Sequence, residues 1–311
     1  PQLHDETRGI HVAGSLASRD KDIYRSQSPS LARRSVTLKI LSMPSSSDLA
    51  KEIVAKLHLG EFADRFRGES IPLGETFSYY VAAAPIAEED MKEYLEEPAE
   101  ALPDVVRAAL PKLLILLVPY LERPAANGKH KAGRQSFLPQ DSLIVMDQPD
   151  EKTRLTLAYV PSPAVGEPGI LAFAVKEIDM SEYHFHLFNA LARAAFDHLP
   201  EAAFAGFMEI LRAELKARVH GEVDQLSWTA KQNLLNKQAS FRGETKLFRE
   251  YARESFFDTL TLYLHGLCCD IDVEPGPRQI ASRHLRKRLE YMRSQFAPPE
   301  GYAVFPEELK N

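Results

Sequence analysis

Apolar residues recur every three or four positions along most of the chain beyond residue 179. This is the period of an amphipathic α-helix, and it predicts helices over about residues 179–199, 204–219, 223–238, 244–267 and 280–296. The first helix has a capping-box start, because Asp179 is followed three residues later by Glu182. Single helices of this length are marginal in water, so we expect these helices to pack as a bundle.

Shorter apolar runs before residue 179 predict strands at residues 36–41, 113–118, 143–146, 155–160 and 170–175. A short helix is expected near residues 49–57, with Gly60 as its stop, and another between Pro103 and Pro111. The predicted fold class is therefore α+β and helix-rich. It divides into a flexible tail (1–34), a small α/β part (35–178) and a helical part (179–311), and the last two parts can pack as one domain.

The composition is that of a folded soluble protein, with 44% hydrophobic and 26% charged residues among 311. The longest apolar run is far too short to cross a bilayer, so no membrane insertion is expected. The two cysteines, Cys268 and Cys269, are adjacent and cannot form a disulfide framework, which favours a reducing compartment and predicts a cytoplasmic protein. Their acidic neighbours predict raised thiol pKa values and inert side chains.

Charge is unevenly distributed along the chain. The net charge of −6 makes nucleic-acid binding unlikely as a function class. Residues 88–100 hold seven acidic side chains and one lysine, a pattern typical of a solvated helical face. The last predicted helix is basic. It is either a solvated face with internal ion pairs, or it binds phosphates, an acidic protein partner or the chain's own acidic segment at residues 88–100. The candidate partner-binding residues are Arg283, Arg286, Lys287, Arg288 and Arg293.

The fourth predicted helix carries a polar stripe in an otherwise apolar segment. At 100° per residue, Glu250, Glu254, Asp258, Thr261 and His265 fall on one side of the helix. The simplest interpretation is that this stripe is the water-facing side of the helix. The alternative is a divalent-metal site inside the bundle, since carboxylates four residues apart with a nearby imidazole can bind such an ion.

Three further histidines are candidate ligands. His184 and His186 follow Glu182, and on a helix His186 lies on the polar side while His184 turns toward the apolar side. His220 stands where a helix ends, a position that the helix dipole already explains. The complete set of candidate metal ligands is Glu254, Asp258, His265, His184, His186 and His220.

The sequence contains no phosphate-binding loop, dinucleotide fingerprint, zinc-protease motif or hydrolase nucleophile elbow. Two function classes remain open. The first is a regulatory or scaffolding protein that binds a protein partner through its helical half. The alternative is a metal-dependent enzyme with a carboxylate and histidine site in the bundle, whose substrate the sequence does not identify.

Overall fold

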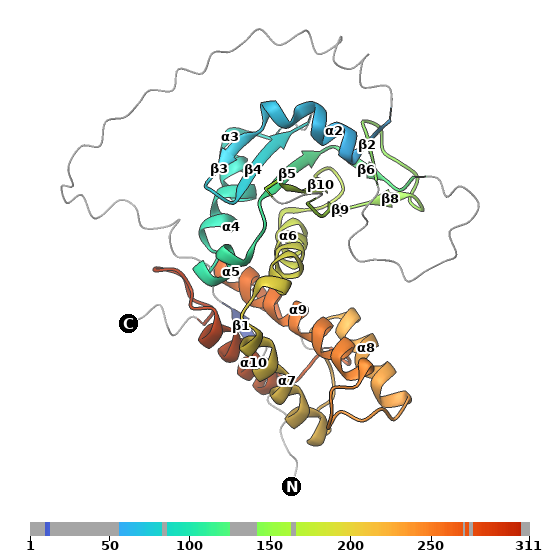
Figure 1. Ribbon diagram of the computed structural model, residues 1–311, viewed down its shortest axis with the longest axis vertical. Coiled ribbons are helices and arrows are strands. Elements are labelled where there is room, and N and C mark those ends of the chain that lie inside the picture. The colour runs from blue at the N-terminus through green and yellow to red at the C-terminus, as the bar shows by residue number, and fades with distance from the viewer. Residues whose placement is uncertain are drawn as a thin grey trace, which may run out of the picture.

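The computed structural model describes residues 10–12, 56–82, 86–124, 142–162, 166–269, 271–273 and 276–305. Within these residues it confirms a helix-rich α+β fold, in which the two larger sheets lie at one end of the molecule and the long helices beyond residue 200 at the other (Figure 1). The predicted strand at 36–41, most of the predicted helix near 49–57 and the predicted tail, apart from residues 10–12, lie outside the described residues.

The central sheet has five strands in the order β3-β4-β5-β10-β9. The middle strand, β5, is parallel to both of its neighbours, β4 and β10. Every residue of β5 and β10 is buried, as expected for strands covered on both faces. The bounds are β3 (Ile71–Leu73), β4 (Phe77–Val81), β5 (Leu113–Val118), β9 (Leu157–Val160) and β10 (Gly169–Ala174).

Smaller elements surround this sheet. A second sheet has the order β2-β7-β6-β8, and β1 pairs with β11. The expectation that a helix stops at Gly60 is wrong: Gly60 lies inside α2, because Leu59, Phe62 and Ala63 pack together against the sheet. The bounds are β1 (Ile10–Val12), β2 (Leu57–His58), α2 (Leu59–Phe66), η2 (Arg67–Glu69), β6 (Tyr120–Glu122), β7 (Leu143–Val145), β8 (Arg154–Leu155) and β11 (Ile271–Val273).

The acidic segment and the helices beyond residue 179 follow the predicted pattern. Asp179 caps the first long helix by accepting a hydrogen bond from the backbone N–H of Glu182 at 2.8 Å. The helix bounds are α3 (Glu88–Met91), η3 (Lys92–Glu96), α4 (Glu97–Glu100), α5 (Asp104–Ala109), α6 (Met180–Ala195), η4 (Phe196–His198), α7 (Glu201–Lys216), α8 (Gln225–Asn236), α9 (Lys246–Cys268) and α10 (Ser282–Gln295).

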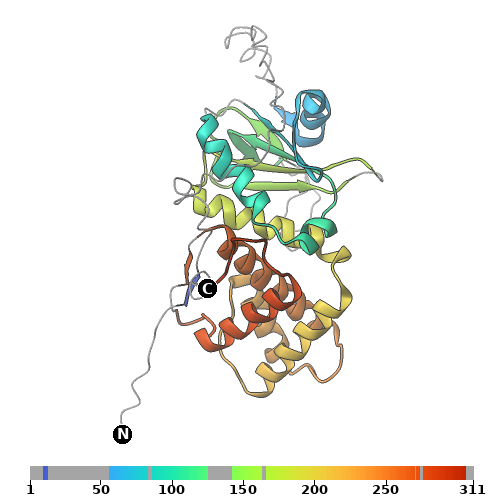
Figure 2. The ribbon, with the colours of Figure 1, turned by 90° about the vertical axis from the view of Figure 1, so that its left-hand side faces the viewer.

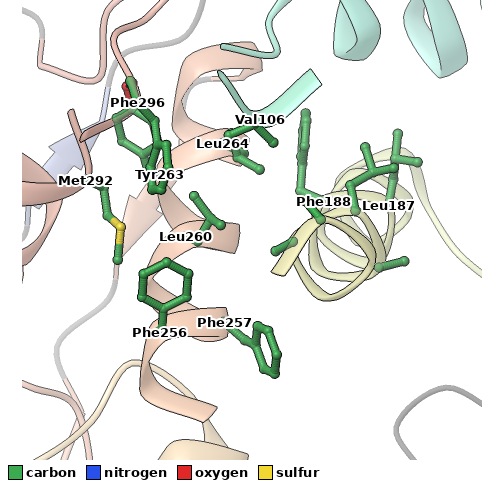
Figure 3. Packing of buried hydrophobic residues seen from close by; sticks show 14 of the residues in the cluster. Val106, Leu187, Phe188, Phe256, Phe257, Leu260, Tyr263, Leu264, Met292 and Phe296 are labelled. Carbon is green, nitrogen blue, oxygen red and sulfur yellow. The ribbon is translucent and has the colours of Figure 1, made fainter. Parts of the chain in front are cut away.

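Helix α6 lies between the sheet and helices α7–α10 (Figure 2), and α9 runs through the middle of the helical part. In α9, 15 of 23 residues are buried, so most of the surface of this helix is covered by other elements. Tyr263 lies beside Phe296 at the end of α10, while Leu264 faces Val106 of α5 and Phe188 of α6 (Figure 3). One hydrophobic cluster extends from the sheet to α10, so the two parts share a core.

None of the helices among the described residues combines the length and the apolar character that crossing a membrane would require.

Candidate functional site

The polar stripe of α9 faces other helices. Asp258 and Thr261 are at most 1% exposed and His265 is 5% exposed. The Thr261 hydroxyl accepts a hydrogen bond from the Asn189 side chain of α6 at 3.2 Å. The expectation that this stripe meets water is therefore wrong, and the reason is that α9 is the central helix of the bundle.

The stripe does not converge on one point, however. The Glu254 carboxylate accepts a hydrogen bond from the Arg193 guanidinium of α6 at 2.9 Å. The Asp258 carboxylate accepts one from the backbone N–H of Ser227 in α8 at 3.2 Å. Of the three predicted ligands on this helix, only His265 meets another histidine, because its ring centroid lies 6.1 Å from that of His184.

His184, His265 and Cys269 form one cluster at the junction of α6 with the end of α9. Their candidate ligand atoms all lie within 4.8 Å of one another. His265 and Cys269 are four residues apart at the C-terminus of α9, and the backbone N–H of Cys269 donates to the His265 carbonyl at 2.9 Å. This spacing places both side chains on the same side of the helix, where α6 presents His184.

The Glu93 carbonyl of η3 fixes the orientation of the His184 ring. It accepts a hydrogen bond from His184 Nε2 at 2.9 Å. Because a carbonyl only accepts, Nε2 carries the hydrogen, and Nδ1 is left facing Cys269 Sγ at 3.2 Å. A ring whose far nitrogen donates to a carbonyl is the arrangement that commonly orients metal-binding and catalytic histidines.

The two thiols have opposite electrostatic environments. Hydrogen bonding by the Cys268 thiol, together with the imidazoles of His184 and His265, lowers the pKa of Cys269. The hydrogen bond to Cys269 and burial raise the pKa of Cys268. Burial by itself would lower the pKa of His184, but the hydrogen bond and the charge of Cys269, together with the interactions with Glu93, outweigh burial and the pKa is raised. The prediction of a raised thiol pKa is thus wrong for Cys269, because hydrogen bonding by Cys268 and by two imidazoles that the fold brings close lowers its pKa.

Two buried polar atoms, one in this cluster and one in the residue before His184, make no hydrogen bond within the described part of the chain. They are Nε2 of His265 and the hydroxyl of Tyr183. Tyr183 is completely buried, and it precedes His184 in α6. Leaving a buried polar group without a partner costs about 1–3 kcal/mol, so such atoms call for an explanation.

The other predicted histidine ligands lie elsewhere. His186 faces Glu182, with Nε2 3.4 Å from the carboxylate. His220 is exposed, and its Nε2 lies 3.0 Å from the Pro277 carbonyl, with its ring edge on Trp228. The structure therefore brings together His184 and His265 from the predicted set and adds Cys269, which the sequence interpretation missed. The His-x-x-x-Cys spacing at the end of a helix was the signal available for finding it.

The basic helix α10 has two different sides. Four of the five predicted partner-binding residues are exposed: Arg283, Arg286, Lys287 and Arg293. The fifth, Arg288, is 0% exposed, and its guanidinium donates to the carboxylates of Glu214 and Glu222. Arg288 therefore belongs to the interior of the bundle and has no surface to offer a partner.

No family model, curated protein or solved structure matches this chain.

Proposed function

We propose that this protein binds a transition-metal ion through His184, His265 and Cys269. The observation that carries the proposal is the buried His265, whose ring lies beside a thiol and a second imidazole and whose Nε2 has no hydrogen-bond partner among the described residues. Bound to a metal, this nitrogen would gain the partner that the protein does not provide. Glu254, Asp258, His186 and His220 play no part in the proposed site, since their contacts hold them elsewhere.

The ligand set favours zinc. Imidazole and thiolate ligands suit Zn²⁺, with bonds of about 2.0–2.3 Å, so ligand atoms around one ion lie roughly 3.5 Å apart. The Cys269–His184 pair already has a separation of 3.2 Å, and side-chain adjustments of about an ångström would bring in His265. The lowered pKa of Cys269 favours the thiolate that a metal requires. A reducing compartment such as the cytoplasm would keep that thiol available.

Three protein ligands leave a fourth position open around a tetrahedral ion. Structural zinc sites are usually closed by four protein ligands, whereas catalytic sites keep a position for water or substrate. In such a site the ion supplies Lewis acidity and lowers the pKa of bound water. We therefore infer a metal-dependent enzyme rather than a metal-stabilised fold, with His184 oriented by the Glu93 carbonyl.

Titration of chelator-stripped protein with Co²⁺ tests this proposal. We expect one ion per chain and a near-ultraviolet charge-transfer band from the Co²⁺–thiolate bond. Cys269→Ser should lose that band, and His265→Phe should weaken binding at least tenfold.

Cys268→Ser is the matched control, because it removes the neighbouring thiol and leaves the three proposed ligands intact. It should retain the band. Equal spectra for both serine variants, or no Co²⁺ binding at micromolar protein, would overturn the proposal.

A partner-binding role is the second candidate, and the exposure of four basic side chains along α10 favours it. An acidic protein partner would match this charge. Combining Arg283→Glu with Lys287→Glu should reduce capture of such a partner without changing metal content. Unchanged capture would exclude this surface.

A further inference from the structure

We propose that the Asp258 carboxyl is a pH-responsive latch that ties the start of α8 to the central helix α9. The proposal does not depend on the metal site, because Asp258 lies seven residues before His265 and its carboxylate is hydrogen-bonded to Ser227 of α8. It rests on the position of one buried carboxyl group at the junction of α6, α8 and α9.

Asp258 is 1% exposed, and its two carboxylate oxygens differ in their hydrogen bonding. Oδ2 accepts a hydrogen bond at 3.2 Å from the backbone N–H of Ser227, in the first turn of α8. Oδ1 is buried and has no hydrogen-bond partner among the described residues. In an ionised carboxylate, Oδ2 would accept the hydrogen bond from the Ser227 N–H, and the negatively charged Oδ1 would have no hydrogen-bond donor.

The charged groups around Asp258 come from each neighbouring helix. On α8, the N-cap residue Asp224 repels a negative charge at this point. On α6, Arg193 attracts it, but this guanidinium already donates to Glu254 of α9 and to the side-chain oxygen of Asn189. On α9, Glu254 is the acidic residue one turn earlier. The nearby Glu222 and Arg288 neutralise each other.

These contacts make the neutral form of Asp258 the favoured one in the folded protein. Burial raises the pKa of Asp258 to about 7, against the lowering effect of the Ser227 hydrogen bond. Above that pH the folded state must hold a buried negative charge with an unmet oxygen. Loosening the first turn of α8 would let water reach Oδ1, so this turn is where the structure should open first.

The sign of the effect follows from proton binding. The folded state holds the proton up to about pH 7, whereas the unfolded chain releases it near pH 4. Stability contributed by this group is therefore present below pH 4 and lost as the pH rises through about 7. The unfolding constant should rise by up to about tenfold per pH unit in that interval from this group alone.

Comparing the wild type with Asp258→Asn tests the latch. The amide keeps an oxygen for the Ser227 N–H and cannot ionise, so the variant should lose this pH dependence and be more stable than the wild type at pH 8. Taking the difference between the two proteins cancels groups that titrate in both.

Hydrogen exchange provides a local readout. In the wild type, amides in the first turn of α8 should exchange at least several-fold faster at pH 8 than at pH 6, after correction for intrinsic rates, and those in α10 should not. Asp224→Asn retains a capping oxygen but removes a negative charge that repels ionised Asp258. In this variant the pH at which exchange in the first turn of α8 is half-way to its high-pH rate should be lower than in the wild type. Parallel pH profiles for wild type and Asp258→Asn, or opening confined to other helices, would overturn the inference. Metal binding can succeed or fail independently of either result.

Discussion

Two groups of buried polar side chains contact α9 toward its opposite ends, and they differ in whether their hydrogen bonds are complete. Near the start of the helix, Arg288 of α10 donates to Glu214, Glu222 and Ser255. Two further donors complete this group, since Lys231 Nζ lies 3.1 Å and the Tyr251 hydroxyl 2.5 Å from Glu222. Its two carboxylates and two cations balance, so we call this group the closed cluster.

At the other end, His184, His265 and Cys269 form what we call the open cluster. One imidazole is fully bonded, to the Glu93 carbonyl and the Cys269 thiol, and the other has a buried nitrogen without a partner. Polar groups retained in a core with all partners present serve the fold. A polar group retained without a partner costs stability and calls for an explanation, which at His265 we propose is a ligand. Substitutions in the two clusters separate these two roles.

The largest expected effect belongs to the closed cluster. Arg288→Met should lower the free energy of unfolding by about 3–5 kcal/mol, because Glu214 and Glu222 would be left buried with too little positive charge. Chemical denaturation measures this directly. Lys287→Met, one residue away and exposed, should change stability by less than about 0.5 kcal/mol. Similar losses in both variants would refute the structural role of the closed cluster.

The second prediction concerns acid. Burial would raise the pKa of Glu222, but Arg288 and Lys231 outweigh it and lower the pKa to about 2. The stability from this carboxylate is therefore present above its unfolded value near 4.5 and is lost as the pH falls toward 2. It amounts to roughly 3 kcal/mol. Glu222→Gln should flatten the denaturation profile in that range, and an unchanged profile would contradict the assignment.

The smallest expected effect on stability belongs to the open cluster. His265→Phe should alter the free energy of unfolding of the metal-free protein by less than about 1 kcal/mol, because it replaces a ring that has an unsatisfied nitrogen with an apolar one. The same denaturation assay measures it. A loss above 3 kcal/mol would make His265 part of the structural framework and remove the main argument for a ligand.

The comparison also shows how far the sequence could lead. The periods of α6 and α9 predicted both helices to within two residues at most ends, because the apolar spacing of a helix is a local property. The orientation of α9, by contrast, depends on contacts with helices that are distant in the sequence. Its polar stripe looks like a surface in sequence, and only packing on all sides, by α6, α8 and α10, turns it inward.

The site was partly predictable for the same reason. His265 and Cys269 lie four residues apart, a spacing visible in the sequence. His184 is 85 residues before Cys269, and the Glu93 carbonyl that orients it is another 91 residues before His184. Likewise, the sequence does not distinguish Arg288 from the other four basic residues on α10. Its carboxylate partners, Glu214 and Glu222, are more than 60 residues away in the sequence.

The central claim is that the open cluster binds a metal and the closed cluster does not need one. The most direct test is the free energy of unfolding with Zn²⁺ and with a chelator, for the wild type and for Cys269→Ser. At a Zn²⁺ concentration about 100 times the dissociation constant, the wild type should gain about 2.7 kcal/mol and the variant should gain almost nothing. Equal gains in the two proteins, or no gain in the wild type, would contradict the claim.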